Sequence, residues 1–352
     1  MGDVPARTDF VERRVGERRG ALLPKADARA ATALQLGPVA RFLDAEDTIE
    51  VCVNRAGEVL VETRKGWQTH AVPELDYVRL ERLAIAVASL TDQTWSPVMP
   101  LLSGTLPDGC RLQIVGPPAV APGSISLTIR KPSMSAFSVD DLDRMGLFAE
   151  TEVMGTVDKT DRLGQMLSKL QIAEFLKAAV RRKQNIIIAG ATGSGKTTLS
   201  KALIAEVPLD ERILTIEDTP ELVVPHANRV AMYYAKGMGK KLGPKDLLES
   251  ALRMRPDRIF LAELRDGTAF YYLRSVNSGH PGSITTVHAG SCAFAIEQLT
   301  LLVGESDGGA RLGRDDTRSM LRQMIDVVVQ CKRQDGRFLV TEIDFIAGRR
   351  SA

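Results

Sequence analysis

The chain has 352 residues, of which 44% are hydrophobic and 26% charged, so it is long enough for two packed domains. Its formal net charge is only +2 and aromatic residues make up 5%, which argues against a nucleic-acid binder with a basic groove or a stacking platform. The four cysteines are far apart and include no C-x-x-C pair, which argues against a zinc site and a disulfide framework. No apolar run approaches the roughly 18 residues needed to span a bilayer, and no targeting segment is visible, so we expect a cytoplasmic protein.

The first part of the chain predicts an arm followed by a small α+β domain. Residues 1–35 are charged and rich in Ala and Arg, and we expect a mobile arm or a loosely packed helix there. We place the N-terminal domain at 36–131, because short β-type runs and one helical pattern alternate with turn residues in this stretch. Its expected elements are a hairpin of strands 48–53 and 58–62, a helix over 74–91, and strands at 110–115 and 124–129.

The pattern changes in the second half of the chain. Residues 132–162 are rich in Ser, Gly and acids, and we interpret them as a linker with one short helix near 138–145. From 163 to 352 helical and strand-like segments alternate, which predicts an α/β domain with a mainly parallel sheet. The expected strands are 185–189, 212–216, 258–262 and 283–287, the helices are 168–183, 197–206, 245–254, 267–277 and 291–303, and a hairpin lies within 327–346.

A glycine-rich motif joins the first of these strands to a helix. The segment Gly190–Thr197 satisfies G-x-x-x-x-G-K-[ST], the P-loop pattern, in which backbone N–H groups and a helix N-terminus surround phosphate. Lys196 should reach the β- and γ-phosphates, and the Thr197 hydroxyl should hold Mg²⁺. The alternative is a glycine turn that happens to precede a helix. We expect ATP and Mg²⁺ as cofactors, with these binding residues: Gly190, Ala191, Thr192, Gly193, Ser194, Gly195, Lys196, Thr197 and Thr198.

Acidic residues follow two other predicted strands. Glu217 and Asp218 end one strand, and Glu263 ends the apolar run 258–262 in a Walker B layout. Because ligands sit at the carboxyl ends of parallel strands, these acids should face the nucleotide. Glu217 is our candidate for polarising the attacking water, and Glu263 for orienting the Mg²⁺ shell, partly through water. The alternative is that Glu217 and Asp218 only cap a turn.

Two of the four histidines flank one predicted strand. His280 and His288 are eight residues apart, a spacing that suits no helical metal motif. His288, at the end of the strand, is our candidate for sensing the γ-phosphate by hydrogen bonding. The alternative is a pair of structural histidines.

These motifs resemble a known family. The C-terminal half is similar to the secretion-superfamily traffic ATPases, and most of all to the VirB-type ATPases of type IV secretion and conjugation systems. The segments that carry the resemblance are Gly193–Thr198, Ile216–Leu222, Leu252–Ile259, Glu263–Arg265 and Leu273–Ser283. In the N-terminal domain, Ile49–Trp67 resembles the first hairpin of the family and Thr128–Ser133 its last strand.

The resemblance implies more than the motifs alone. It implies a RecA-like fold for the C-terminal domain, a homo-hexameric ring and a nucleotide held between the two domains. Arg111 and Arg130 match the N-terminal arginines that reach the triphosphate, although each could also be an ordinary surface arginine. The implied partners are inner-membrane components of a secretion or conjugation apparatus and other secretion ATPases, with the protein peripheral at the inner-membrane face. No sequence-specific nucleic-acid binding is expected.

Several functions stay open on the sequence. The leading hypothesis is an ATP hydrolase that powers substrate translocation or pilus biogenesis in a type IV secretion system. The alternatives are a sister ATPase of a type II secretion, type IV pilus or tight-adherence pilus system, a nucleic-acid motor, and a nucleotide-gated scaffold that hardly turns over.

Overall fold

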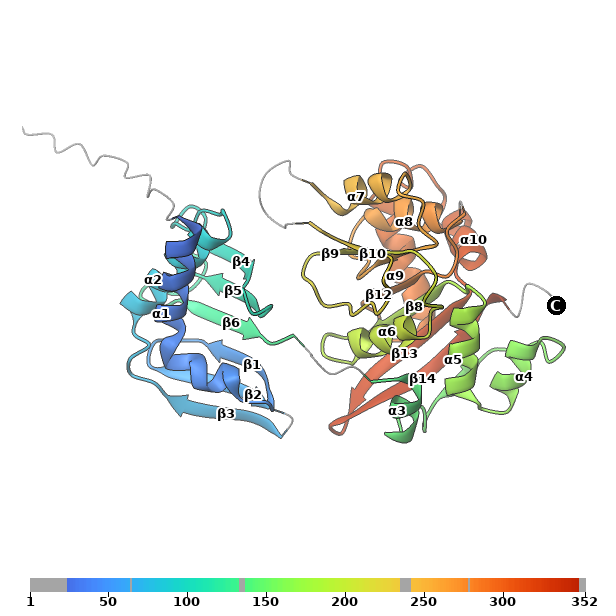
Figure 1. The fold of residues 1–352 in the computed structure, drawn as a ribbon, viewed down its shortest axis with the longest axis horizontal. Helices are drawn as coiled ribbons and strands as arrows, with labels where there is room; N and C mark the ends of the chain where they lie inside the picture. Colours follow the sequence, from blue (N-terminus) through green and yellow to red (C-terminus); the bar gives the residue numbers. More distant parts are fainter. Residues whose placement is uncertain (1–23, 64, 133–136, 235–241, 278, 348–352) are drawn as a thin grey trace, which may run out of the picture.

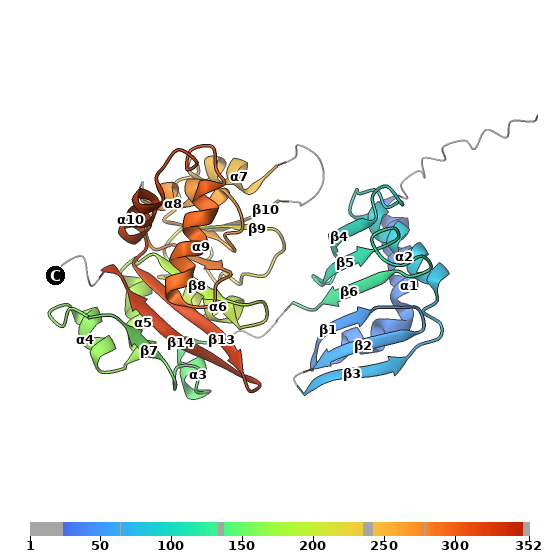
Figure 2. The ribbon, with the colours of Figure 1, turned by 180° about the vertical axis from the view of Figure 1, so that it is seen from behind.

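A computed structural model describes residues 24–63, 65–132, 137–234, 242–277 and 279–347. Figure 1 and Figure 2 show two lobes, an N-terminal α+β domain and a larger α/β domain. The expected fold class, a mainly parallel α/β domain with a smaller α+β domain before it, is confirmed. No helix among these residues combines the length and apolarity needed to cross a bilayer.

The N-terminal domain is one antiparallel sheet covered by two helices. Its elements are α1 (Lys25–Asp44), β1 (Thr48–Val53), β2 (Glu58–Thr63), β3 (Gly66–Ala71), α2 (Tyr77–Leu90), β4 (Leu101–Thr105), β5 (Arg111–Val115) and β6 (Ser126–Arg130). The strand order is β3-β2-β1-β6-β5-β4. In both views the sheet lies between the two helices and the C-terminal domain, so the ends of its strands are available to a site between the lobes.

The C-terminal domain alternates helices and strands. Its elements are α3 (Val139–Arg144), β7 (Glu152–Met154), α4 (Arg162–Ser168), α5 (Ile172–Arg181), β8 (Ile186–Gly190), α6 (Lys196–Ala205), β9 (Ile213–Glu217), β10 (Arg229–Tyr233), α7 (Pro244–Ala251), β11 (Arg258–Leu261), α8 (Thr268–Asn277), β12 (Ile284–Val287), α9 (Cys292–Gly304), α10 (Arg314–Met324), β13 (Val327–Gln334) and β14 (Arg337–Phe345).

The strands of the C-terminal domain form two hydrogen-bonded groups that are joined into one sheet by a single bridge. One group has the order β10-β9-β11 and the other the order β12-β8-β13-β14-β7. A single parallel bridge between Glu263 and Thr286 connects β11 to β12. The pairs from β10 through β13 are parallel, and β14 returns antiparallel to β13. The carboxyl ends of β8, β9, β11 and β12 therefore meet at one edge, where parallel sheets bind ligands.

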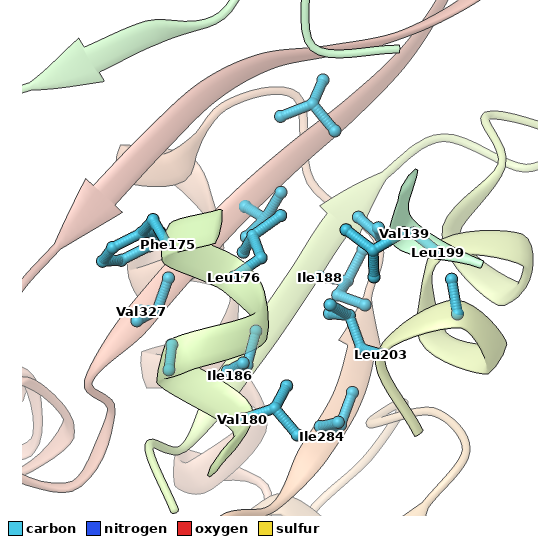
Figure 3. Packing of buried hydrophobic residues seen from close by; sticks show 14 of the residues in the cluster. Val139, Phe175, Leu176, Val180, Ile186, Ile188, Leu199, Leu203, Ile284 and Val327 are labelled. Carbon is cyan, nitrogen blue, oxygen red and sulfur yellow. The ribbon is translucent and has the colours of Figure 1, made fainter. Parts of the chain in front are cut away.

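The central strands are buried on both faces. All five residues of β8 and all five of β9 are buried, as expected for strands of a parallel sheet covered by helices. Figure 3 shows Phe175, Leu176 and Val180 of α5 on the same face of the sheet as Ile186 of β8. These residues belong to one core cluster with Leu199 and Leu203 of α6. This packing fixes β8 and α6 relative to each other, and so fixes both ends of the loop between them.

Several elements differ from the sequence-based expectation. The helix expected over 168–183 is α5, which begins only at Ile172 because Leu170, with φ +55°, separates it from the end of α4 at Ser168. The strands β3, β4, β7 and β10 and the helices α4 and α10 were not expected. β3 and β4 are the two edge strands of their sheet. Most of their residues are exposed or half-buried, so few of them are apolar and the sequence signal for a strand is weak.

Two expected boundaries also look different in the structure. α1 begins at Lys25, within the stretch expected to be an arm, and buries Ala28 and Thr32; residues 1–23 lie outside the described residues. Within the expected linker, α3 forms where a short helix was predicted, and its Val139 and Leu142 join the core of the C-terminal domain. β7 pairs with β14, so this part of the expected linker belongs to the C-terminal sheet.

Candidate active site

The loop between β8 and α6 has a backbone that only glycine fits at its key positions. Gly190 has φ +155°, and a Cβ added there would lie 2.4 Å from Ser194 Oγ and 2.5 Å from Cys331 O. Gly195 has φ +94° and stands directly before the first residue of α6. L-residues rarely adopt such a backbone. The resulting loop places amide groups at a helix N-terminus, which is favourable for an anion such as phosphate.

Lys196 folds back over this loop. Its Nζ donates hydrogen bonds to Gly190 O at 2.8 Å and to Ala191 O at 2.9 Å. Burial lowers the pKa of the ammonium, and the positive charges of Arg130 and Arg265 act in the same direction, whereas Glu263 opposes them. An anionic ligand beside Nζ would offset the cost of this burial.

Several hydroxyl groups line the cavity beside the loop, among them those of Ser194, Thr197 and Ser200. Ser194 and Ser200 are buried, and their Oγ atoms have no hydrogen-bond partner within the described part of the chain. Thr197 Oγ1 donates to Glu221 Oε2 at 3.4 Å. Buried hydroxyls without partners are rare in folded proteins, and phosphate oxygens or water held by a metal would satisfy them.

Glu217 does not face this cavity. Its side chain is 1% exposed, and Oε1 accepts hydrogen bonds from Glu221 N at 3.0 Å and Leu222 N at 2.8 Å. Burial raises the pKa of its carboxyl, and the two backbone donors oppose the rise. These bonds use the carboxylate to close the turn after β9, which is the alternative considered for it from the sequence.

Glu263 does face the cavity. Its backbone forms a parallel bridge with Thr286 of β12, so its position is set by the sheet. Oε2 accepts a hydrogen bond from Arg265 Nη2 at 2.5 Å, and Oε1 lies 2.8 Å from His288 Nε2. Burial lowers the pKa of His288, and the charge of Lys196 lowers it further, although Glu263 opposes both effects. The strand ends thus bring together a carboxylate, an arginine and a largely neutral imidazole.

Arg111 and Arg130 reach the cavity from the N-terminal sheet. They are cross-strand neighbours at the ends of β5 and β6. Arg111 Nη2 donates to Asp218 Oδ1 at 2.9 Å, and its Nε lies 3.0 Å from Glu221 Oε1. Arg130 lines the same cavity. The two domains therefore meet at this cavity, which measures about 190 Å³.

The remaining predicted residues belong to the glycine loop. Thr192 and Gly193 line the cavity together with Ser194, Lys196 and Thr197. The others shape the loop behind them or begin the helix after it: Gly190, Ala191, Gly195 and Thr198.

The donor set fits a magnesium–phosphate group. Thr197, Asp218 and Glu263 supply oxygen atoms, which Mg²⁺ prefers. The described residues contain no cluster of three or more His, Cys, Asp or Glu side chains that could hold a metal by themselves. Mg²⁺ in phosphate-transfer sites commonly takes one or two protein ligands and completes its shell with phosphate and water, so this sparse set is sufficient.

Comparisons with known proteins agree with this geometry. Residues 155–336 match the family model of type II/IV secretion system proteins. The type IV secretion system protein VirB11 of Bartonella henselae is 53% identical over 324 residues, covering 88% of this chain and 91% of the relative. The chain belongs to the VirB11 family. The VirB11 protein of Brucella suis is 43% identical over 308 residues, with 85% of each chain covered.

Solved structures extend the comparison with the VirB11 family. The crystal structure of the VirB11 ATPase from the Brucella suis type IV secretion system, in complex with sulphate, has 39% sequence identity and a TM-score of 0.52, covering 93% of this chain and 98% of that one. The ATPase DotB of Legionella pneumophila is 18% identical with a TM-score of 0.57, covering 88% and 79%, which supports the fold alone. The membership supports a secretion ATPase.

Asp218, which was expected to face the nucleotide, lines the cavity. Sequence reasoning missed two further members of this site, Glu221 and Arg265, which line the same cavity; Arg265 Nη1 donates to Asp218 Oδ2 at 2.8 Å. Both lie within segments that carried the family resemblance, yet no role was given to them. The signal was present in their charge and in their place directly after β9 and β11, where a parallel sheet turns its strand ends toward a ligand.

Proposed function

We propose that the chain is an Mg²⁺-dependent ATP hydrolase that drives a type IV secretion system. The observation that carries the proposal is the shared cavity: a glycine loop with Lys196, a carboxylate at Glu263 and an arginine from the other domain all line it. This combination supplies phosphate binding, a candidate base and positive charge, which are the parts that phosphoryl transfer needs.

Each residue of the loop has a role in this proposal. The amide groups of residues 190–198 surround the phosphates, and Lys196 exchanges its two loop carbonyls for phosphate oxygens. Mg²⁺, when bound, neutralises phosphate charge and orients the γ-phosphoryl group. Thr197 and Glu263 would hold it, Glu263 partly through water, and the unpartnered hydroxyls of Ser194 and Ser200 complete the polar lining.

Glu263 takes the role of polarising the attacking water. It lies in the cavity and is held in place by Arg265 and His288, whereas both hydrogen bonds from the turn commit Glu217 to a structural role. A general base must reach the water from which it takes a proton. His288 orients Glu263 and stands where it can sense the γ-phosphate.

Arg111 and Arg130 complete the site from the N-terminal domain. A guanidinium neutralises charge spread over phosphate oxygens and can bond two of them at once. Because these residues belong to the other domain, their approach to the phosphates couples the nucleotide state to the position of that domain.

The relatives supply the setting of this activity. We infer that the chain assembles as a homo-hexameric ring, works at the cytoplasmic face of the inner membrane, and contacts membrane components of the apparatus and other secretion ATPases. ATP hydrolysis then powers substrate translocation, pilus biogenesis or both. The 53% and 43% identities to VirB11 proteins of type IV systems favour this setting over a type II or pilus system.

Steady-state phosphate release by the purified full chain tests the activity. We expect turnover with ATP and Mg²⁺, loss of turnover with EDTA, and less than about a twofold change on adding DNA. Tight nucleotide binding without turnover would instead support a nucleotide-gated scaffold. Strong stimulation by DNA would support a nucleic-acid motor.

Mass photometry with and without Mg²⁺ and an ATP analogue tests the ring. We expect hexamers, and a larger hexamer fraction when nucleotide is bound, since a ligand shifts an equilibrium toward the state it prefers. A monomer under all conditions would contradict the ring.

A further inference from the structure

Glu221 makes two contacts that belong to different domains. Its Oε2 accepts the hydrogen bond from Thr197 Oγ1 at 3.4 Å, at the start of α6. Its Oε1 lies 3.0 Å from Arg111 Nε at the start of β5 in the N-terminal domain. The side chains of Glu221 and Arg111 are 26% and 31% exposed, so this pair is partly shielded from solvent. One carboxylate thus joins the candidate Mg²⁺ ligand to the candidate phosphate-binding arginine.

A longer chain of contacts continues from this carboxylate. Arg111 also pairs with Asp218, Asp218 pairs with Arg265, and Arg265 pairs with Glu263. Close by, Thr105 Oγ1 and Thr219 Oγ1 lie 3.4 Å apart across the same domain boundary. Asp218 therefore accepts a hydrogen bond from Arg111, and Glu221 lies within ion-pair distance of Arg111 Nε. The two carboxylates stand beside the guanidinium where phosphate oxygens could bind it.

We propose that Glu221 is a positioning residue that holds Arg111 at the site as a substitute for phosphate and releases it when nucleotide binds. This inference rests on the proposed function, because it assumes that Arg111 binds the nucleotide phosphates. To bind them, Arg111 must first give up its pair with Glu221, and that loss weakens nucleotide binding. Glu221 then keeps its bond to the Thr197 hydroxyl, which leaves a lone pair of the hydroxyl oxygen available to Mg²⁺.

The proposed pair between Glu221 and Arg111 depends on the length of the Glu221 side chain as well as on its charge. Glu221→Gln removes the charge and keeps the length, whereas Glu221→Asp keeps the charge and shortens the side chain by one methylene. A general electrostatic repulsion between residue 221 and phosphate would be relieved by Gln and retained by Asp. A pair that needs the full length of the glutamate side chain is weakened by both Glu221→Gln and Glu221→Asp.

The experiment is a double-mutant cycle on the full chain, with the affinity for the non-hydrolysable analogue AMP-PNP and Mg²⁺ measured by calorimetry. The variants are Glu221→Gln, Glu221→Asp, Arg111→Ala and the two doubles. Glu206→Gln is the matched control, because it also removes one carboxylate near α6, and its pair with Arg181 lies outside the cavity. Circular dichroism checks that each variant is folded.

We expect Glu221→Gln and Glu221→Asp each to bind the analogue about 3–10-fold more tightly than the wild type, a gain in the range of one partly exposed ion pair. In the Arg111→Ala background both changes should alter affinity by less than about twofold, and the KM for ATP should fall in the single variants without a rise in kcat. The control should match the wild type.

Other outcomes overturn the inference. Equal gains in both backgrounds, or a gain for Gln but none for Asp, would mean general electrostatics. Weaker binding of both single variants would mean that Glu221 supports the bound state. If the wild type fails to bind the analogue at all, the proposed function fails together with this inference, whereas wild-type binding without coupling removes this inference alone.

Discussion

Glu263 lies 2.8 Å from His288 across the gap between β11 and β12, measured from Oε1 to Nε2. The two residues follow different strands, 25 positions apart by number, and the bridge between Glu263 and Thr286 sets their spacing. The hydrogen bond from Arg265 Nη2 to Oε2, with His288 beside Oε1, orients the carboxylate of Glu263 in the cavity. The assignment of the base rests on this arrangement.

Exchange of Glu263 for Gln should separate binding from turnover. Gln keeps the shape of Glu but cannot accept a proton, so we expect Mg²⁺–ATP binding to persist and turnover to fall at least about 100-fold. Glu217→Gln is the matched comparison and should keep more than about a third of the activity, since its amide oxygen can still accept the two backbone hydrogen bonds. Single-turnover assays and nucleotide binding measure both. If Glu217→Gln traps ATP while Glu263→Gln stays active, the roles are reversed.

Replacement of Lys196 by Ala should nearly abolish hydrolysis. The phosphates lose their nearest compensating charge, and removal of one such group typically costs about 10²–10³ in rate. The fold should survive, because the loop carbonyls of Gly190 and Ala191 lose hydrogen bonds worth only about 1 kcal/mol each. Phosphate release and circular dichroism check the two statements. A folded variant with wild-type turnover would refute the assignment of the loop.

Arg111→Ala and Arg130→Ala test whether the N-terminal domain completes the site. Arginine fingers contribute about 10³–10⁵ in rate in P-loop enzymes, and we expect about 10–100-fold per residue here because two arginines share the task. Lys should rescue little at either position, since an ammonium cannot bridge two oxygens in a fork. Turnover is compared in variants confirmed to be folded and oligomeric. Wild-type rates in both would mean that the N-terminal domain does not act in hydrolysis.

Arg258 is a stability residue rather than a site residue. It is fully buried, pairs with Glu211 at 2.8 Å, and donates to Val180 O at 2.9 Å. Arg258→Met leaves Glu211 without its main partner and should cost about 3–5 kcal/mol of unfolding free energy, as breaking buried pairs does. Arg181→Met is the control, because its pair is exposed and should cost at most about 1 kcal/mol. Urea unfolding measures both, and equal losses would contradict the expectation.

The same pair predicts an acid dependence of stability. Burial works against the charged form of Glu211, but its hydrogen bonds and ion pairs with Arg258 and Lys183 outweigh this effect and hold its pKa below the ordinary value of 4.5. A carboxyl with a lower pKa in the folded state adds stability above its unfolded pKa, and this stability is lost as the pH falls through the folded pKa. Wild-type stability should therefore decline below about pH 4.5, with a smaller decline in Arg258→Met. Urea midpoints from pH 3 to 7 measure it, and identical declines would count against this role of Glu211.

The sequence by itself determined the parts of this protein that depend on local order. A buried run, three glycines, a lysine and a helix are contiguous, so the glycine loop at Gly190–Thr197 could be predicted without tertiary information, and its phosphate chemistry stays a prediction. The alternation of strands and helices predicted the parallel sheet, and the order of the motifs predicted the family. These features can be read from the sequence because each depends only on residues that are neighbours along the chain.

The tertiary structure decided what depends on residues far apart in sequence. Glu217 and Glu263 look alike as acids after apolar strands, and only the folded turn shows that the amides of Glu221 and Leu222 bind Glu217 while Glu263 faces the cavity. The partners of Arg111 are 107 and 110 positions away by number, on another domain. β7 is likewise a strand only because its backbone pairs with that of β14. A carboxylate, a guanidinium or a weak strand can satisfy its hydrogen bonds in many ways, and packing of the whole chain selects among them.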